Sequence, residues 1–249
     1  RLLYFLLVLI SVDFSLNAQT ISGTVKNAKT GEAMPFANVF VNNTTIGSTT
    51  DVNGKYLITG NLPRNIELVA SFVGYKTETK SFSLSATNKV DFKLDPLESI
   101  LTEVELKTRR DKKWERDLRR FKDVFLAVPD DPFASQLEIK NPWVLDFETV
   151  KESGPNYVHA TAQEPLQLVN DALGYDVTYY LKDYRFYNNR SSYVGFVFFD
   201  PKDISDSTKL AITEANQETS YVGSIRHLLK AILLAKSVDE NFEIFQVLP

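Results

Sequence analysis

Short segments of alternating apolar and polar residues, separated by turn-forming residues roughly every ten positions, run from residue 20 to residue 94. The segment VDFKL is the clearest, because Val90, Phe92 and Leu94 fall on one face of an extended chain while Asp91 and Lys93 fall on the other. Other segments repeat the alternation with Val39 and Val41, with Tyr56 and Ile58, and with Leu68, Ala70 and Phe72. Such strands around one core are typical of a β-sandwich or barrel, and about seven are predicted here.

The stretch TTDVNGKY admits two interpretations, because Asp51, Asn53 and Gly54 stand in the order that opens many calcium loops. An EF-hand loop also needs a Glu about twelve positions after the first Asp, since calcium requires about six to eight oxygens. That position is Leu62, and Lys55 places a cation directly after Gly54. Asn-Gly between alternating segments is a strong hairpin signal, because both residues tolerate positive φ. A turn without calcium is therefore predicted.

The N-terminus has the order of a secretory signal peptide. A basic residue precedes an apolar run from Leu2 to Ile10, and a short polar stretch ends at Ala18. Asp13 interrupts the run before the roughly 20 apolar residues that a membrane-spanning helix needs. Residues 1–18 are therefore predicted to be removed on export to the periplasm, outer membrane or cell surface. Because the first residue is Arg1 and not Met, we expect at least one residue before it. No Cys follows the cleavage point, so no lipid anchor is expected there.

The stretches GTV, TGEAMPFANV, TTDVNGKY, LP and VGYKT follow one another between Ile21 and Leu84. Together they resemble the carboxypeptidase-like regulatory domain, a transthyretin-like sandwich found at the front of many exported proteins of Bacteroidota-type bacteria. The resemblance implies a seven-stranded, transthyretin-like or prealbumin-like β-sandwich over residues 19–95. It also implies an extracytoplasmic packing or presentation module without chemistry of its own, which often precedes an outer-membrane receptor plug or a peptidase.

Catalytic motifs are missing from the 249 residues, of which 43% are hydrophobic and 24% charged. The absence of Cys excludes disulfides, thiolate zinc sites, iron–sulfur ligation and cysteine nucleophiles. A zinc carboxypeptidase needs a His and a Glu at H-x-x-E spacing, and neither His159 nor His227, the only histidines, has the acid. No G-x-S-x-G, P-loop or G-x-G-x-x-G stretch occurs. No catalytic residue, metal or cofactor is therefore predicted, although a carboxylate pair stays open as a catalytic alternative.

Residues 96–125 are predicted to form a linker and a basic amphipathic helix. The part from Lys107 to Lys122 holds nine basic and three acidic residues, and one interpretation is a patch for nucleic acid or lipid. Its large apolar residues recur at intervals of four, three and four, on one helical face: Trp114, Leu118, Phe121 and Phe125. Residues 123–249 contain nineteen acids and ten bases. We therefore expect the helix to dock its aromatic side and to lay its basic side against an acidic body, and we expect no nucleic-acid partner, since the whole chain has a net charge of -4.

Residues 126–249 are predicted to form an α+β domain with an antiparallel sheet, incomplete at its C-terminus. The segments LQLV, VTYYL, YRFYN and YVGFVFF suggest a meander, and FEIFQV suggests a last strand. In GSIRHLLKAILLAK, Ser224 is predicted to cap a helix. Its apolar stripe consists of Ile225, Leu228, Leu229, Ile232 and Leu233. The stretches WERDLRRFKDVFL, NPWVLDF, ATAQEPLQLVNDALGY and YVGSIRHLLKAIL resemble a Bacteroidota family of regulatory-domain proteins, a resemblance that implies no activity.

Arg226 and His227 are the candidate binding residues. They adjoin at a predicted helix start, where a guanidinium and an imidazole can hold an anion with help from backbone N–H groups. The favoured alternative is a pair of surface or domain-contact residues. Asn170, Gly174 and Tyr175 are interpreted as turn and packing residues.

Two functions from different classes fit these observations. The first is a non-catalytic exported structural or interaction protein of the bacterial cell envelope, with an envelope protein as partner and no membrane span after signal removal. The second is the N-terminal part of a longer TonB-dependent outer-membrane receptor, or of a carboxypeptidase whose active domain lies beyond residue 249. A receptor would continue into a plug and barrel, and a peptidase would add H-x-x-E.

Overall fold

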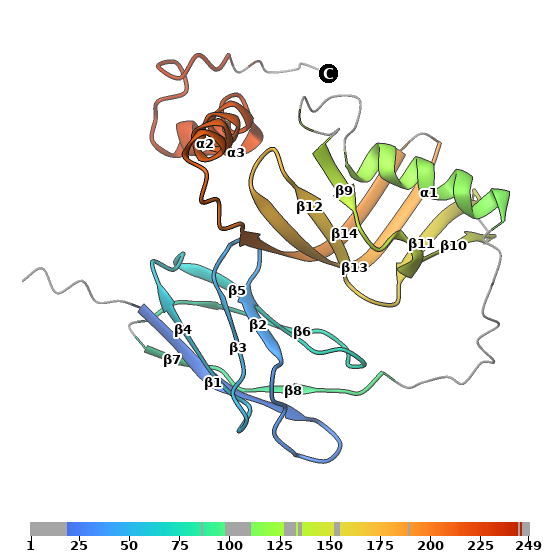
Figure 1. Ribbon diagram of the computed structural model, residues 1–249, viewed down its shortest axis with the longest axis vertical. Coiled ribbons are helices and arrows are strands. Elements are labelled where there is room, and N and C mark those ends of the chain that lie inside the picture. Colours follow the sequence, from blue (N-terminus) through green and yellow to red (C-terminus); the bar gives the residue numbers. More distant parts are fainter. Residues whose placement is uncertain are drawn as a thin grey trace, which may run out of the picture. The chain divides into compact units, whose positions relative to one another are not determined.

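The computed structural model describes residues 19–85, 87–97, 111–126, 133, 136–151, 155–188, 190–243 and 245. Within these residues the chain is mostly β-sheet, with three α-helices (Figure 1). The chain divides into two compact units, Arg1–Thr102 and Glu103–Pro249. The predicted signal peptide and most of the predicted linker lie outside the described residues.

The N-terminal unit is built from two facing sheets. In chain order its described strands are β1 (Gln19–Asn27), β2 (Asn38–Val41), β3 (Gly47–Thr49), β4 (Lys55–Gly60), β5 (Asn65–Ser71), β6 (Glu78–Ser83), β7 (Thr87–Lys89) and β8 (Phe92–Leu94). One sheet has the order β4-β1-β7, with β8 also on β1, and the other has the order β3-β2-β5-β6. Eight strands stand where about seven are predicted. Both β7 and β8 pair in parallel with β1 and are separated only by Val90 and Asp91.

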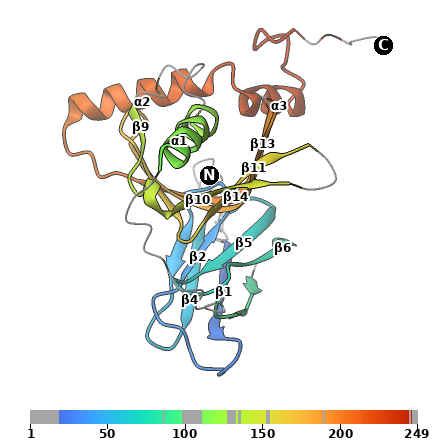
Figure 2. The ribbon, with the colours of Figure 1, turned by 90° about the vertical axis from the view of Figure 1, so that its right-hand side faces the viewer.

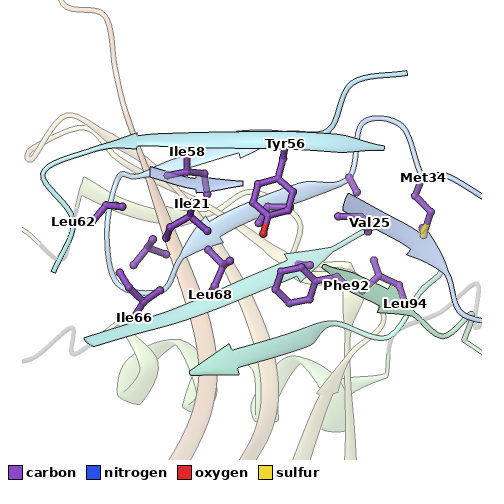
Figure 3. Close-up of a cluster of buried hydrophobic side chains, with 14 residues drawn as sticks. Ile21, Val25, Met34, Tyr56, Ile58, Leu62, Ile66, Leu68, Phe92 and Leu94 are labelled. Atoms are coloured by element: carbon purple, nitrogen blue, oxygen red, sulfur yellow. The ribbon is translucent and has the colours of Figure 1, made fainter. Parts of the chain in front are cut away.

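The core of the N-terminal unit lies between its two sheets (Figure 3). Eight residues predicted to face inward are buried: Val39, Val41, Tyr56, Ile58, Leu68, Ala70, Phe92 and Leu94. Phe72 and Val90 are partly buried against the same cluster. The alternation therefore predicts correctly which side of each strand is apolar, because successive side chains of a strand point to opposite faces.

The stretch TTDVNGKY forms a turn, as the sequence predicts. It is not a hairpin, because β3 pairs with β2 and β4 pairs with β1 in the other sheet. The Asp51 carboxylate accepts hydrogen bonds from the backbone N–H groups of Asn53, at 2.9 Å, and Lys55, at 2.8 Å. The bond from Lys55 is the main reason that the pKa of Asp51 is lowered. Gly54 has a φ of 70°, and a Cβ there would lie 2.6 Å from the Val25 carbonyl oxygen, so only glycine fits. The absence of calcium stays a prediction.

The C-terminal unit contains one six-stranded antiparallel sheet and three α-helices among its described residues. In chain order the elements are α1 (Lys112–Phe125), β9 (Leu137–Ile139), the 3-10 turn η2 (Pro142–Val144), β10 (Leu145–Val150), β11 (Tyr157–Ala162), β12 (Leu166–Asn170), β13 (Tyr175–Tyr187), β14 (Arg190–Pro201), α2 (Ser207–Tyr221) and α3 (Ile225–Leu233). Strand β13 pairs with β12 at its start and with β11 at its end, and β14 pairs along its other side.

The predicted meander is present, with one difference and one error. VTYYL and the first four residues of YRFYN lie in the single strand β13, which ends at Tyr187, rather than in two strands. The predicted strand FEIFQV is wrong at Phe242, Glu243 and Phe245, which are in no strand, and its other residues lie outside the described part. Phe242 instead packs its ring against His227, with 4.9 Å between ring centroids, after a turn in which Asn241 has a φ of 60°.

The turn between β12 and β13 uses Asn170, Gly174 and Tyr175 as predicted. The Asn170 side chain accepts a hydrogen bond from the Leu173 backbone N–H at 3.0 Å. Gly174 has a φ of 69°. The Tyr175 ring packs edge-on against Phe199.

Helix α1 lies against the sheet (Figure 2). Its aromatic side packs on the sheet core, as its periodicity predicts. Asp111 caps the helix by accepting a hydrogen bond from the Trp114 backbone N–H. The Trp114 indole N–H donates to the Leu145 carbonyl at 2.9 Å. Phe121 is fully buried, and its ring contacts those of Phe125, Phe147 and Tyr184.

Two arginines on the basic side of α1 pair with an acid of the same helix. The Asp117 carboxylate is buried, with Arg116 Nε at 3.1 Å and Arg120 at 3.8 Å. Both arginine side chains are about half exposed. These two arginines therefore balance an acid of their own helix, whereas the sequence predicts that they lie against an acidic body. Periodicity misses Asp117 because it treats every charged residue as part of the outer face.

The Tyr184 hydroxyl gives a testable expectation for the stability of this core. Tyr184 is 1% exposed, and its Oη has no hydrogen-bond partner among the described residues. Burial, with Asp117 and Tyr193 nearby, raises its pKa to about 12. Because an unpaired buried polar group is costly, Tyr184→Phe should raise the free energy of unfolding by about 1 kcal/mol at pH 7.

The pH dependence of Tyr184→Phe follows from the same raised pKa. The fold favours the neutral phenol, so the contribution of Tyr184 to stability is fully present below pH 10 and is lost as the pH rises towards 12. Tyr184→Phe should therefore remove the part of the fall in unfolding free energy between pH 10 and pH 12 that is due to Tyr184. Thermal unfolding at pH 7, 10 and 11.5 measures both effects, with Tyr187→Phe as the exposed control. If Tyr184→Phe were less stable than wild type at pH 7, the Tyr184 hydroxyl would have to form a hydrogen bond, which would contradict this account.

Candidate functional site

The junction between α2 and α3 contains the predicted binding residues. Helix α2 ends at Tyr221, and the chain then turns through Gly223, which has a φ of 79°. Ser224 caps α3 as predicted, because its side chain accepts a hydrogen bond from the His227 backbone N–H at 3.1 Å. The left-handed conformation at Gly223 lets the chain reverse between the two helices.

His227 is buried at the centre of this junction. Its Nδ1 accepts a hydrogen bond from the Gly223 backbone N–H at 3.1 Å, and its Nε2 lies 3.3 Å from the Glu240 carboxylate. The rings of Tyr221 and Phe242 both lie with centroids 4.9 Å from the imidazole. His227 thus links the end of α2, the start of α3 and the segment after α3.

The neighbouring Arg226 is exposed. Both nitrogens of the His227 ring contact groups of this chain. These contacts favour the alternative interpretation, in which Arg226 and His227 are surface or domain-contact residues. Anion binding by Arg226 and His227 stays a prediction.

The outer side of α3 is the more apolar one. The buried residues of α3 are His227 and Ala231, on its inner side. The exposed fractions of the outer side chains are 77% for Ile225, 55% for Leu229, 46% for Ile232 and 85% for Leu233. These four residues are called the α3 apolar face. A surface helix normally turns such a stripe towards the core. The sequence predicts these four residues together with Leu228, which is half-buried. It gives no sign that the stripe faces outward, because periodicity does not say which side of a helix is covered.

A polar cluster that the sequence did not reveal surrounds His159. Its Nδ1 lies 3.1 Å from Glu148 and its Nε2 lies 3.2 Å from Asp183, which also pairs with Arg185 at 3.0 Å. The register of β10, β11 and β13 places Glu148, His159 and Arg185 in one row across the strands. Residues so far apart in sequence meet only through strand pairing. The cluster is a polar network in which His159 contacts acids of two neighbouring strands and Asp183 forms an ion pair with Arg185 of its own strand. Cross-strand polar pairs of this kind contribute to the stability of a sheet.

Within the described residues, no group of three or more His, Asp or Glu side chains is arranged to hold a metal ion. No helix in this part of the chain is long and apolar enough to cross a membrane.

Residues 21–106 match the family model described as the CarboxypepD_reg-like domain. The N-terminal unit therefore carries a carboxypeptidase-regulatory-like domain, as its motifs indicate. This domain family is non-catalytic. No curated protein matches the chain.

Several solved structures resemble parts of the chain weakly. A cohesin–X-dockerin complex from Acetivibrio cellulolyticus is 19% identical, with a TM-score of 0.26, over 30% of this chain and 52% of that one. A candidate carbohydrate-binding protein from Bacteroides uniformis is 11% identical, with a TM-score of 0.27, over 66% of this chain and 60% of that one. A candidate membrane-associated protein of unknown function from Bacteroides fragilis is 15% identical, with a TM-score of 0.26, over 66% and 65%. The chain thus spans less than two thirds of each, and scores this low carry no functional argument.

Proposed function

We propose that the chain is an exported, non-catalytic structural or interaction protein of the bacterial cell envelope. The observation that carries the proposal is the match of residues 21–106 to a regulatory-like domain family that is non-catalytic. In this proposal the N-terminal unit is a transthyretin-like sandwich whose role is packing and presentation, and the C-terminal unit offers surfaces to a protein partner of the envelope.

The side chains of the N-terminal unit support a packing role. Its buried residues are almost all apolar and fill the space between two sheets. Its buried polar residues are Thr50 and Ser71 among those described, and Thr50 bonds to backbone, donating to the Met34 carbonyl and accepting from the Ala37 N–H. A catalytic site instead requires polar groups that converge on a reacting atom.

The proposal is tested by expressing a C-terminally tagged chain in its host and fractionating the cells. Export predicts a product that begins at Gln19 and is found with the envelope, because cleavage is expected after Ala18. N-terminal sequencing gives the cleavage point, and a cytoplasmic enzyme serves as the fractionation control. A full-length product in the cytoplasm would contradict export.

A further inference from the structure

We propose that the α3 apolar face, formed by Ile225, Leu229, Ile232 and Leu233, docks on an anionic lipid surface. In this arrangement α3 lies parallel to the membrane, and its apolar side chains enter the boundary between headgroups and acyl chains. The proposal goes beyond the envelope function above, because it names a second kind of contact, with lipid rather than protein.

The charges around the face favour an anionic surface. No acidic residue occurs between Glu218 and Asp239, whereas Arg226, Lys230 and Lys236 lie in this stretch. The rest of residues 123–249 has seven bases against nineteen acids, so the basic character is local. An apolar face bordered by basic residues is the pattern of helices that bind anionic membranes.

The positions of the basic residues suit this contact. Arg226 and Lys230 directly follow Ile225 and Leu229, so each lies about 100° around the helix from an apolar residue of the face. Both are exposed. The long side chain of Arg226 can reach phosphate groups beside the helix while the apolar residues enter the lipid. The Lys230 ammonium lies 5.7 Å from the centroid of the Tyr221 ring and reaches a phosphate by leaving that ring.

The junction around His227 holds the face in a fixed orientation. The Ser224 cap, the hydrogen bond from the Gly223 N–H and the flanking rings of Tyr221 and Phe242 all fix the inner side of α3. The helix is therefore formed before it meets a membrane. Binding does not have to meet the ordering cost that a disordered amphipathic segment would incur.

A second copy of the chain is a less suitable occupant of the face. Two α3 helices facing each other would gather Arg226, Lys230 and Lys236 of both copies with no acid from the same stretch. Like charges that meet across an interface are unfavourable. An anionic lipid surface has no such cost.

The test is co-sedimentation of the mature chain, from Gln19, with two kinds of vesicle. One is phosphatidylcholine alone, and the other contains about 30% phosphatidylglycerol, whose anionic headgroups supply the surface charge. Wild type should bind the anionic vesicles more tightly. The double change Leu229→Glu with Leu233→Glu should weaken that binding at least about tenfold, because two apolar contacts become acidic. The double change Leu210→Glu with Ile212→Glu, at two exposed sites on α2, is the matched control and should stay within about twofold, because acids outside the face change the surface attraction little.

The charge contribution is measured separately by changing Arg226, Lys230 and Lys236 to Gln, one at a time. Each change should weaken binding to the anionic vesicles by about fivefold and reduce its salt dependence. Three outcomes would overturn the proposal: no binding by wild type, equal binding by the Leu229 and Leu233 variant, or equal binding to both vesicle types. Sedimentation equilibrium tests whether a second copy of the chain covers the face instead. If wild type forms a dimer, the double change at Leu229 and Leu233 abolishes that dimer and no vesicle binding is seen, the face belongs to a second copy.

Discussion

Phe121→Ala is expected to lower the free energy of unfolding of the C-terminal unit by about 3–5 kcal/mol, the usual range for deleting a buried phenylalanine side chain. Phe121 is fully buried between α1 and the sheet, where its ring contacts Phe125, Phe147 and Tyr184. Without it the helix loses its main attachment. The cavity cannot close easily, because the surrounding aromatic rings are large and hold one another in place.

Tryptophan fluorescence measures this effect selectively. The chain has two tryptophans, Trp114 and Trp143, and both belong to the C-terminal unit. Arg119→Ala is the matched control, since Arg119 is exposed on the same helix and its loss should change stability by less than about 1 kcal/mol. If Phe121→Ala moved the fluorescence transition no more than Arg119→Ala, the docking of α1 would not be a main source of stability.

Gly23→Ala is expected to destabilise the N-terminal unit by about 3 kcal/mol, at the upper end of the range for overpacking. A Cβ at Gly23 would overlap the carbonyl group of Val90, where the chain passes from β7 to β8. That carbonyl accepts a hydrogen bond from the Tyr56 hydroxyl at 2.6 Å, and the Val90 N–H donates to the Ser22 carbonyl at 2.8 Å. The added methyl group must displace Val90 and therefore weaken both bonds.

Calorimetry of the intact chain and of residues 19–95 measures the effect of Gly23→Ala. Gly31→Ala is the control, because a Cβ there meets no atom within 4 Å and only the φ of 74° opposes it, at a cost of about 1 kcal/mol. The fluorescence of Trp114 and Trp143 should be unchanged in both variants. A Gly23→Ala protein as stable as Gly31→Ala would mean that Val90 moves freely, which contradicts its two hydrogen bonds.

The predictable part of the fold is the part that depends on local pattern. Alternation identified the inward residues of the N-terminal unit, and intervals of three and four residues identified the docked face of α1. Both patterns work because side-chain direction repeats with the local backbone. The turn at Gly54 was predictable for the same reason, since the need for positive φ is local, although Asn53 does not adopt one.

The features that sequence reasoning missed depend on contacts between distant residues. The row of Glu148, His159 and Arg185 exists only because β10, β11 and β13 pair in one register. The burial of Asp117 depends on how α1 lies on the sheet. The exposure of the α3 apolar face depends on which side of the helix His227 and its neighbours cover. A sequence pattern reveals a face but not what lies against it.

Isolation of the mature chain from the envelope with its bound partner tests the central claim most directly. The tagged chain is cross-linked in cells, purified from the envelope fraction, and its products are identified beside those of an unrelated exported protein with the same tag. The account predicts a product that begins at Gln19, joined to a defined envelope protein, and without peptidase activity when zinc is added. A chain that keeps residues 1–18 in the cytoplasm, or one that cleaves peptides when zinc is supplied, would contradict it.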